Sequence, residues 1–176
     1  MKPASVSIGL TNPQSPVNVG AVMRAAGCFR VDSVFYTGKR YALSARFNTD
    51  TRGASQAIPL TGVSCLLESV PEETKIVCVE LVEGAIPLPE FLHPDRALYV
   101  FGPEDGTLSQ EVIDRADAVV YVPTVGCLNL AATVNVVLYD RMAKSGMSIA
   151  GDELIRQSRD ANNRVRVKVS AEGADT

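Results

Sequence analysis

The sequence has few of the residues from which metal centres and disulfide frameworks are built. It contains one histidine, His93, so a site that needs a pair of histidines is excluded within one chain. Its four cysteines form neither close pairs nor a metal-ligand spacing, at positions 28, 65, 78 and 127. We therefore expect no bound metal and no disulfides, and we interpret the cysteines as reduced thiols of a cytoplasmic protein.

Long apolar runs and the common nucleotide-binding motifs are also absent. No apolar stretch is long enough to span a bilayer, and the N-terminal MKPASVSIGL lacks the apolar core of a secretory signal, so we expect no membrane attachment. Neither the fingerprint GxGxxG nor the loop GxxxxGK[ST] occurs. A nucleotide-dependent oxidoreductase is therefore disfavoured, although it remains an alternative for an α/β protein.

The net charge of −3 is unusual for a protein that binds nucleic acid, but binding responds to local patches of charge. The C-terminal tail is locally basic, with Arg156, Arg159, Arg164, Arg166 and Lys168. Residues 39–52 hold one acidic residue against four cations, Lys39, Arg40, Arg46 and Arg52. Tyr41 and Phe47 lie between these cations, and aromatic rings stack on unpaired bases. This segment is either a solvated surface or a contact with RNA.

The order of apolar patterns predicts an α/β fold. Five segments have the pattern of strands, at 5–10, 32–37, 75–81, 97–102 and 117–122. Segments with helical spacing lie between or after them, at 19–29, 62–70, 107–115, 129–144 and near 152–159. Residues 38–59 have no periodic apolar face and are expected to form a loop. This alternation predicts a mostly parallel sheet with helices on both faces.

Three helix starts carry capping residues. Asn18 and Asn129 each stand where a side chain can accept from the first-turn amides, and Thr107 with Gln110 has the spacing of a capping box. The helix at 129–144 has a second face that is small and apolar, formed by Ala132, Asn135, Val136, Tyr139 and Ala143. That face is either buried within one chain or covered by a second copy of it.

Unusual sequences follow three of the strands, where a doubly wound sheet binds its ligand. They are TNPQSPVNVGAVMRAAGCF, FGPEDGTLSQEV and VPTVGCLNLAATVNVVLYDR. In order and spacing they resemble motifs 1, 2 and 3 of the SpoU-TrmH branch of SPOUT RNA methyltransferases, over residues 5–144. The resemblance implies a methyltransferase domain at 1–150 with a C-terminal trefoil knot, followed by a basic tail at 151–176. It also implies an obligate homodimer and S-adenosylmethionine as cofactor.

The resemblance assigns catalytic roles to four residues that also have ordinary structural readings. Arg24 would be a surface helix residue, or it would grip RNA phosphate with its planar fork and position the target hydroxyl, with a role as base left open. Asn18 and Asn129 would be helix caps, catalytic residues, or both. Glu104 would either favour the positive end of the next helix or belong to the active site.

The same resemblance implies the cofactor site. Gly102 and Pro103 would form a wall of the pocket, while Val122, Cys127 and Leu128 would hold the cofactor through backbone groups. Many relatives have serine where this chain has Cys127, and a thiol is a weaker hydrogen-bonding group. The strand end at Glu80, Leu81 and Val82 matches a further cofactor-contacting position.

These expectations describe an enzyme that transfers a methyl group to a ribose 2′-hydroxyl of RNA without a metal. The chain resembles minimal family members, several of which act on tRNA, so tRNA is the first expected substrate and rRNA the second. The main alternative is a non-catalytic RNA-binding dimer with the same fold, for which Cys127 is the only support.

Overall fold

The computed structural model describes residues 4–45, 58–146 and 150–167. The chain divides into two compact units, Met1–Gly146 and Met147–Thr176. Among the described residues, no helix combines the length and apolarity that crossing a membrane requires. The division into a methyltransferase domain at 1–150 and a tail at 151–176 stays a prediction.

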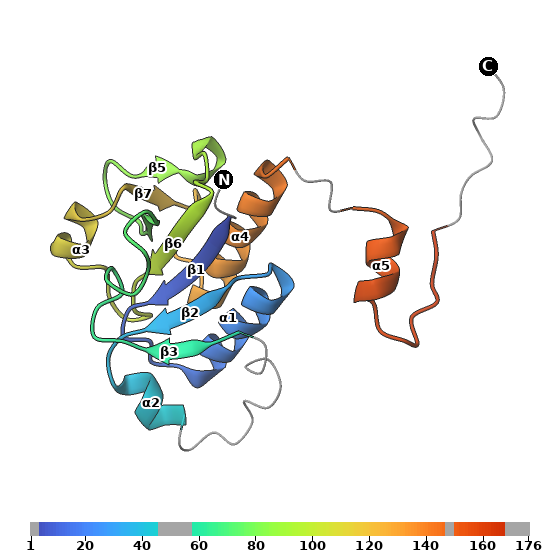
Figure 1. Cartoon of the computed structure of the whole chain (residues 1–176), viewed down its shortest axis with the longest axis horizontal. Coiled ribbons are helices and arrows are strands. Elements are labelled where there is room, and N and C mark those ends of the chain that lie inside the picture. Colours follow the sequence, from blue (N-terminus) through green and yellow to red (C-terminus); the bar gives the residue numbers. More distant parts are fainter. Residues whose placement is uncertain (1–3, 46–57, 147–149, 168–176) are drawn as a thin grey trace. The chain divides into compact units, whose positions relative to one another are not determined.

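The first unit is built on a seven-stranded sheet in the order β3-β2-β1-β6-β4-β7-β5, and every strand pairing in it is parallel (Figure 1). The strands are β1 (Ser5–Leu10), β2 (Ser33–Tyr36), β3 (Leu60–Gly62), β4 (Lys75–Val79), β5 (Ile86–Pro87), β6 (Arg96–Phe101) and β7 (Ala118–Tyr121). The predicted parallel α/β fold is therefore confirmed, whereas the trefoil knot stays a prediction.

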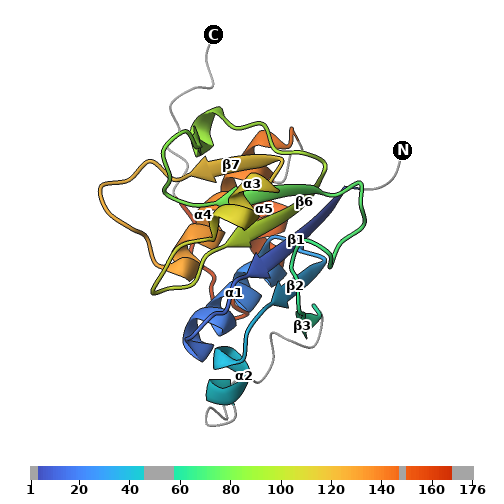
Figure 2. The same ribbon diagram turned by 90° about the vertical axis from the view of Figure 1, so that its left-hand side faces the viewer.

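The central strand β6 is buried on both faces because alternate side chains enter two different cores. Ala97, Tyr99 and Phe101 join the larger core, which includes α1 (Pro16–Cys28) and α4 (Leu130–Lys144). Leu98 and Val100 join the smaller core on the other face, beside α3 (Gln110–Asp114). Helices α1 and α4 pack against each other, as Figure 2 shows from the side.

Two of the three predicted helix caps are wrong. Ser15 caps α1 and accepts from the Asn18 amide, because the helix starts at Pro16, two residues before Asn18, and proline has no N–H that would need an acceptor there. Ser109, not Thr107, caps α3 by accepting from the Val112 amide. The predicted cap at Asn129 is confirmed, since its Oδ1 accepts from the amides of Ala131 and Ala132.

Two segment predictions also fail. Residues 62–70 form no helix: β3 ends at Gly62 and turns follow, in which Leu66 is buried against the sheet. The apolar residues of 62–70 have helical spacing in the sequence because those of successive turns face the same core. The expected loop at 38–59 contains a short helix, α2 (Arg40–Ala45), whose Tyr41 ring stacks edge-on against Tyr36 at 5.1 Å between centroids.

The remaining predicted strands and helices are present, and the structure adds two strands that were not predicted, β3 and β5. A 3-10 turn (Leu88–Glu90) precedes β6 and was not predicted. In the second unit, α5 (Asp152–Ser158) forms where the helix near 152–159 was expected. The His93 side chain is buried and lies between the Tyr99 hydroxyl at 2.6 Å and the Asp140 carboxylate at 2.9 Å. Burial lowers the pKa of His93 despite the nearby carboxylate, so this histidine acts as a neutral structural link between β6 and α4.

Candidate active site

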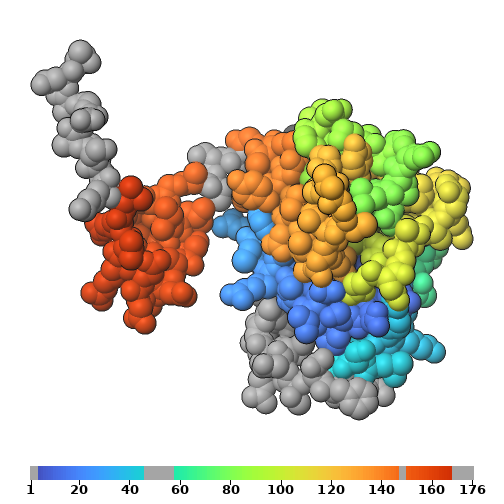
Figure 3. Space-filling view, turned by 180° about the vertical axis from the view of Figure 1, so that it is seen from behind, coloured from blue at the N-terminus to red at the C-terminus, as the bar shows by residue number. Residues whose placement is uncertain are grey.

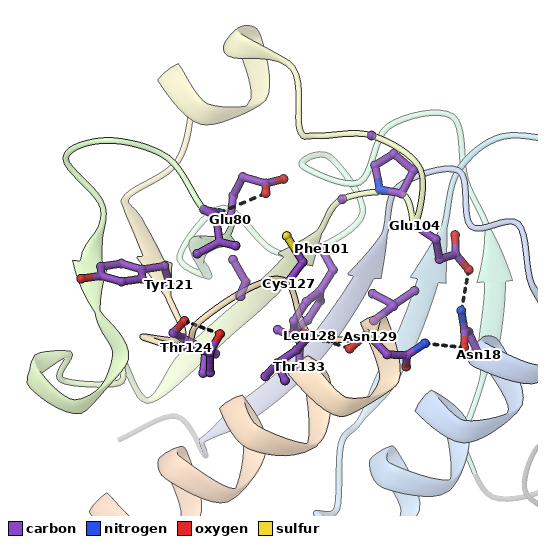
Figure 4. Close-up of a pocket in the computed structure, with 17 residues that line it drawn as sticks. Asn18, Glu80, Phe101, Glu104, Tyr121, Thr124, Cys127, Leu128, Asn129 and Thr133 are labelled. Carbon is purple, nitrogen blue, oxygen red and sulfur yellow. Dashed lines mark hydrogen bonds between the residues drawn. The ribbon is translucent and has the colours of Figure 1, made fainter.

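A cavity of about 270 Å³ opens at the carboxyl ends of β4, β6 and β7 (Figure 4). This is the edge at which open parallel sheets bind their ligands. The segment between β7 and α4 and the first turns of α1 and α4 complete the walls. The lining residues are Asn18, Val79, Glu80, Leu81, Phe101, Gly102, Pro103, Glu104, Gly106, Tyr121, Val122, Thr124, Cys127, Leu128, Asn129, Leu130 and Thr133.

Most of the residues predicted for catalysis and cofactor binding line this cavity, and two do not. Val82 and Arg24 are outside the lining, whereas the other ten predicted residues are part of it. Sequence reasoning missed several neighbours of the predicted residues along the chain. They are Val79, Phe101, Gly106, Tyr121, Thr124, Leu130 and Thr133. The ends of the predicted strands were the available signal for Val79, Phe101 and Tyr121.

Glu80 and Gly102 form one wall together. The Glu80 carboxylate accepts from the Leu108 amide at 3.0 Å and from its neighbour Leu81 at 3.0 Å. A Cβ atom at Gly102 would lie 2.9 Å from Glu80 Oε2 and 3.4 Å from the Leu108 nitrogen. Any larger residue at position 102 would require the Glu80 carboxylate to shift from the place where it joins the end of β4 to the chain after β6.

Glu104 is held by donors from the start of α1. Its carboxylate accepts from the Gln14 amide at 2.9 Å, the Ser15 amide at 3.1 Å and the Asn18 side-chain nitrogen at 3.1 Å. Partial burial by itself raises the pKa of Glu104, but these hydrogen bonds outweigh it and the pKa lies below its usual range. Glu104 is therefore ionised and already engaged, which makes it a poor proton acceptor.

A chain of hydrogen bonds connects residues from all three motifs. Asn18 donates to Glu104, and its Oδ1 accepts from Asn129 Nδ2 at 3.1 Å, as Figure 4 shows. Asn129 also caps α4. The two asparagines thus hold the helices α1 and α4 and the chain after β6 in one arrangement at the edge of the cavity. Asn129 therefore caps α4 and lines the cavity at the same time, and its catalytic role stays a prediction.

The segment between β7 and α4 is stabilised by a hydrogen bond between two of its own residues. Thr124 donates to the Gly126 carbonyl at 2.8 Å, and Gly126 has a φ of 100°, which favours glycine. Cys127 is exposed in this segment, and no basic side chain lines the cavity among the described residues. Cys127 therefore has no partner there that would activate it as a nucleophile. The described residues also contain no cluster of His, Cys, Asp and Glu suited to a metal.

Arg24 lies on the exposed side of α1, away from the cavity of its own chain. At 100° per residue, its direction from the helix axis differs from that of Asn18 by about 120°. Within one chain, Arg24 therefore does not lie with the other predicted catalytic residues in the cavity. Any role in the reaction requires RNA, or a second protomer, on the outer side of α1.

The predicted RNA-binding cations divide into two groups. Arg46 and Arg52 lie outside the described residues. Lys39 is exposed, whereas Arg40 is half-buried and forms an ion pair with Asp105 at 2.7 Å. The ion pair distinguishes Arg40 from a cation that is free to bind phosphate.

We expect Glu104 to contribute pH-dependent stability. Because its pKa is lower in the folded chain, its contribution is complete above the unfolded value of about 4.3 and is lost as the pH falls through the folded pKa. Glu104→Gln should lower the melting temperature at neutral pH, and the difference from wild type should shrink in acid. Melting curves from about pH 7 to about pH 3 test this. A difference that is constant over the range would contradict the assignment.

Comparisons with known proteins agree with this fold. The family model described as the SpoU rRNA Methylase family matches residues 5–139. No curated protein matches the sequence significantly. The SpoU methyltransferase AviRb from Streptomyces viridochromogenes, solved with AdoMet, is 20% identical with a TM-score of 0.67. The match covers 82% of this chain and 59% of AviRb, so the chain spans about three fifths of that protein.

Two other solved structures match over most of their own length. The TrmH/SpoU tRNA modifying enzyme of A. aeolicus is 18% identical with a TM-score of 0.66, and the match covers 88% of this chain and 85% of that one. A structure described as giving insights into the 2-OH methylation of C/U34 on tRNA is 23% identical with a TM-score of 0.69, over 82% and 93% of the two chains. These similarities agree with the fold, and the family model covers most of the chain. The chain belongs to the SpoU rRNA methylase family.

Proposed function

We propose that the protein is an S-adenosylmethionine-dependent RNA methyltransferase that acts on a ribose 2′-hydroxyl of tRNA. The observation that carries this proposal is that three motifs, far apart in the sequence, form one cavity at the strand ends. Family membership supports the reaction class. The tRNA preference is supported by the two tRNA-related structures, which this chain matches over 85% and 93% of their length.

The residues of the cavity suit the proposed cofactor. Val79, Phe101 and Leu130 offer apolar contacts for a nucleoside, and the backbone of Val122 and Leu128 offers polar groups. When bound, the cofactor supplies a methyl group that its sulfonium already activates. The protein must therefore position the hydroxyl, exclude water and keep the cavity in shape, and it needs no metal for this chemistry.

The assigned roles follow from the contacts. Asn18, Glu104 and Asn129 are engaged with one another and hold the walls of the cavity, so we assign them to positioning rather than to proton abstraction. Arg24 is exposed and is assigned to the RNA phosphate next to the target hydroxyl. Lys39, Arg46 and Arg52 are proposed to contact RNA phosphates farther away.

The decisive experiment is mass spectrometry of nucleosides from tRNA and rRNA of cells with and without this gene. Loss of one 2′-O-methyl nucleoside from tRNA is expected. Its loss from rRNA instead would favour the alternative substrate, which the description of the family supports. A non-catalytic RNA-binding dimer predicts that no nucleoside changes and that calorimetry detects no binding of S-adenosylmethionine.

We also propose that the protein is a homodimer. The apolar second face of α4 is not buried within the chain: Ala132, Asn135, Val136, Tyr139 and Ala143 are all exposed. The interpretation that one chain buries this face is therefore wrong. The α4 segment, orange in Figure 3, lies on the surface in that view, and a second copy would cover its apolar side chains.

Tyr139→Arg should weaken the dimer. The Tyr139 side chain is 60% exposed in one chain, so the variant should fold normally as a monomer. In a dimer it would bury an unpaired charge, which is strongly unfavourable. Sedimentation at micromolar concentration should give a dimer for wild type and a monomer for Tyr139→Arg. Ile155→Arg on α5 is a control with a similarly exposed side chain, at 55%. A wild-type species of 18.8 kDa would contradict the dimer.

A further inference from the structure

Arg40, the first residue of α2, makes four side-chain hydrogen bonds, which join the turn after β1 to the loop after β6. Two of its nitrogens bind the two carboxylate oxygens of Asp105, at 2.7 and 3.0 Å. Its Nε and one terminal nitrogen donate to the Asn12 carbonyl, at 3.1 and 2.6 Å. This is the two-pronged geometry that guanidinium can form and ammonium cannot.

The turn that holds Asn12 fits closely against the start of α2. Asn12 and Gly38 both have positive φ values, 42° and 77°. A Cβ atom at Gly38 would overlap the Asn12 side chain, and L side chains rarely adopt this φ, so glycine is favoured there. The backbone conformations at Asn12 and Gly38 thus allow the Arg40 guanidinium to lie between the turn after β1 and the loop after β6.

The same two segments are joined a second time through the neighbouring carboxylate. Glu104 accepts from the amides of Gln14 and Ser15, which follow Asn12 in the turn. Asp105 reaches that turn indirectly, because it binds Arg40 and Arg40 binds Asn12. Two adjacent acidic residues therefore attach one loop to one turn, and this loop supplies Gly102, Pro103 and Gly106 to the cavity wall.

We propose that Arg40 is a positioning residue that clamps the loop after β6 onto the turn after β1 and so sets the shape of the cavity wall. This inference rests on the proposed function for its effect on the reaction. It also reassigns Arg40, which the sequence placed among the RNA-binding cations. Arg40 acts through Asp105 and Asn12 and touches neither RNA nor cofactor.

The exposure of the Arg40 and Asp105 side chains indicates whether loss of the clamp should affect stability or turnover. The side chains of Arg40 and Asp105 are 32% and 57% exposed, and exposed ion pairs contribute little to global stability. The melting temperature should therefore change little without the clamp. Turnover is more sensitive, because small displacements of groups around reacting atoms reduce rates strongly.

The two roles of Arg40 make opposite predictions for Asp105→Ala. If Arg40 were a phosphate contact, removing Asp105 would free it and raise RNA affinity. If Arg40 is a clamp, then Arg40→Ala and Asp105→Ala should each lower kcat about tenfold with saturating RNA, and the double variant should lose no more than either one. Arg40→Lys should rescue little, because lysine lacks the fork. Transfer of a labelled methyl group to unfractionated tRNA from cells lacking the gene measures kcat.

Lys39→Ala is the matched control. Lys39 is exposed beside Arg40, so its loss should reduce the salt dependence of tRNA binding by about one slope unit if it contacts phosphate. Arg40→Ala should leave that slope unchanged. A reduced slope in Arg40→Ala with normal kcat, or tighter tRNA binding in Asp105→Ala, would overturn the clamp.

Hydrogen exchange of backbone amides tests the clamp independently of methyl transfer. The amides of Gln14 and Ser15 should exchange faster in Arg40→Ala and in Asp105→Ala than in wild type or Lys39→Ala. Unchanged exchange in both variants would also overturn the clamp. A wild-type protein that neither binds S-adenosylmethionine nor transfers methyl groups would contradict the proposed function instead, and the exchange result would still decide the role of Arg40.

Discussion

Arg24→Ala should lower methyl transfer about a hundredfold or more, the scale expected when positioning and charge stabilisation in the transition state are lost. The variant should still fold and bind S-adenosylmethionine. The physical reason is its location: Arg24 is exposed on α1 and does not line the cavity. Methyl transfer to tRNA at saturating cofactor, with calorimetry for cofactor binding, measures the two properties separately.

Arg24→Lys separates two forms of phosphate recognition. Lysine retains the positive charge but cannot form paired hydrogen bonds. Little rescue would indicate a two-pronged grip on phosphate, whereas near-complete rescue would indicate that charge suffices. A folded Arg24→Ala protein with normal turnover would remove Arg24 from the active site. If Arg24 is only structural, both variants should have lower melting temperatures, and activity should follow the folded fraction.

Gly102→Val should weaken S-adenosylmethionine binding about a hundredfold, because overpacking costs about 1–3 kcal/mol and each tenfold change in affinity is about 1.4 kcal/mol. The first added carbon would already lie 2.9 Å from the Glu80 carboxylate. The larger side chain would displace Glu80, loosen its bond to Leu108 and fill the cavity. Calorimetry with the cofactor measures the loss.

Gly20→Ala is the control for Gly102→Val. A Cβ atom at Gly20 would meet nothing within 4 Å, so this variant should bind cofactor normally. Circular dichroism must show that Gly102→Val is folded. Undiminished binding in a folded Gly102→Val protein would mean that this wall is not part of the cofactor site.

Mixing Arg24→Ala with Gly102→Val, at a cofactor concentration too low to saturate Gly102→Val, tests where Arg24 acts. If Arg24 serves the cavity of its own chain, a mixed dimer contains no complete site. If it serves the cavity of a partner protomer, a mixed dimer combines an intact cavity from Arg24→Ala with an intact Arg24 from Gly102→Val. Recovery of methyl transfer on mixing would therefore locate Arg24 at an interface, and no recovery would locate its action within one chain.

The sequence alone determined the elements that depend on local patterns. The continuous apolar run at 97–102 predicted a strand covered on both faces, and Asn129 predicted the start of α4; both are confirmed. Local patterns failed where a competing local group was overlooked, as at Ser15 and Ser109, which cap their helices instead of Asn18 and Thr107. The segment at 62–70 failed because tertiary packing, not helical hydrogen bonding, set its apolar spacing.

Only the tertiary structure decided how the candidate residues meet. Asn18 contacts Glu104 and Asn129 across 86 and 111 residues of sequence, and Arg40 contacts Asp105 across 65. The sequence did not give the strand order that places β6 between β1 and β4 and so brings these segments together. It also identified Arg24 without revealing that α1 turns it away from the cavity. Residue type and spacing determine local structure and chemical capacity, whereas contacts between distant segments depend on which strands are neighbours in the sheet.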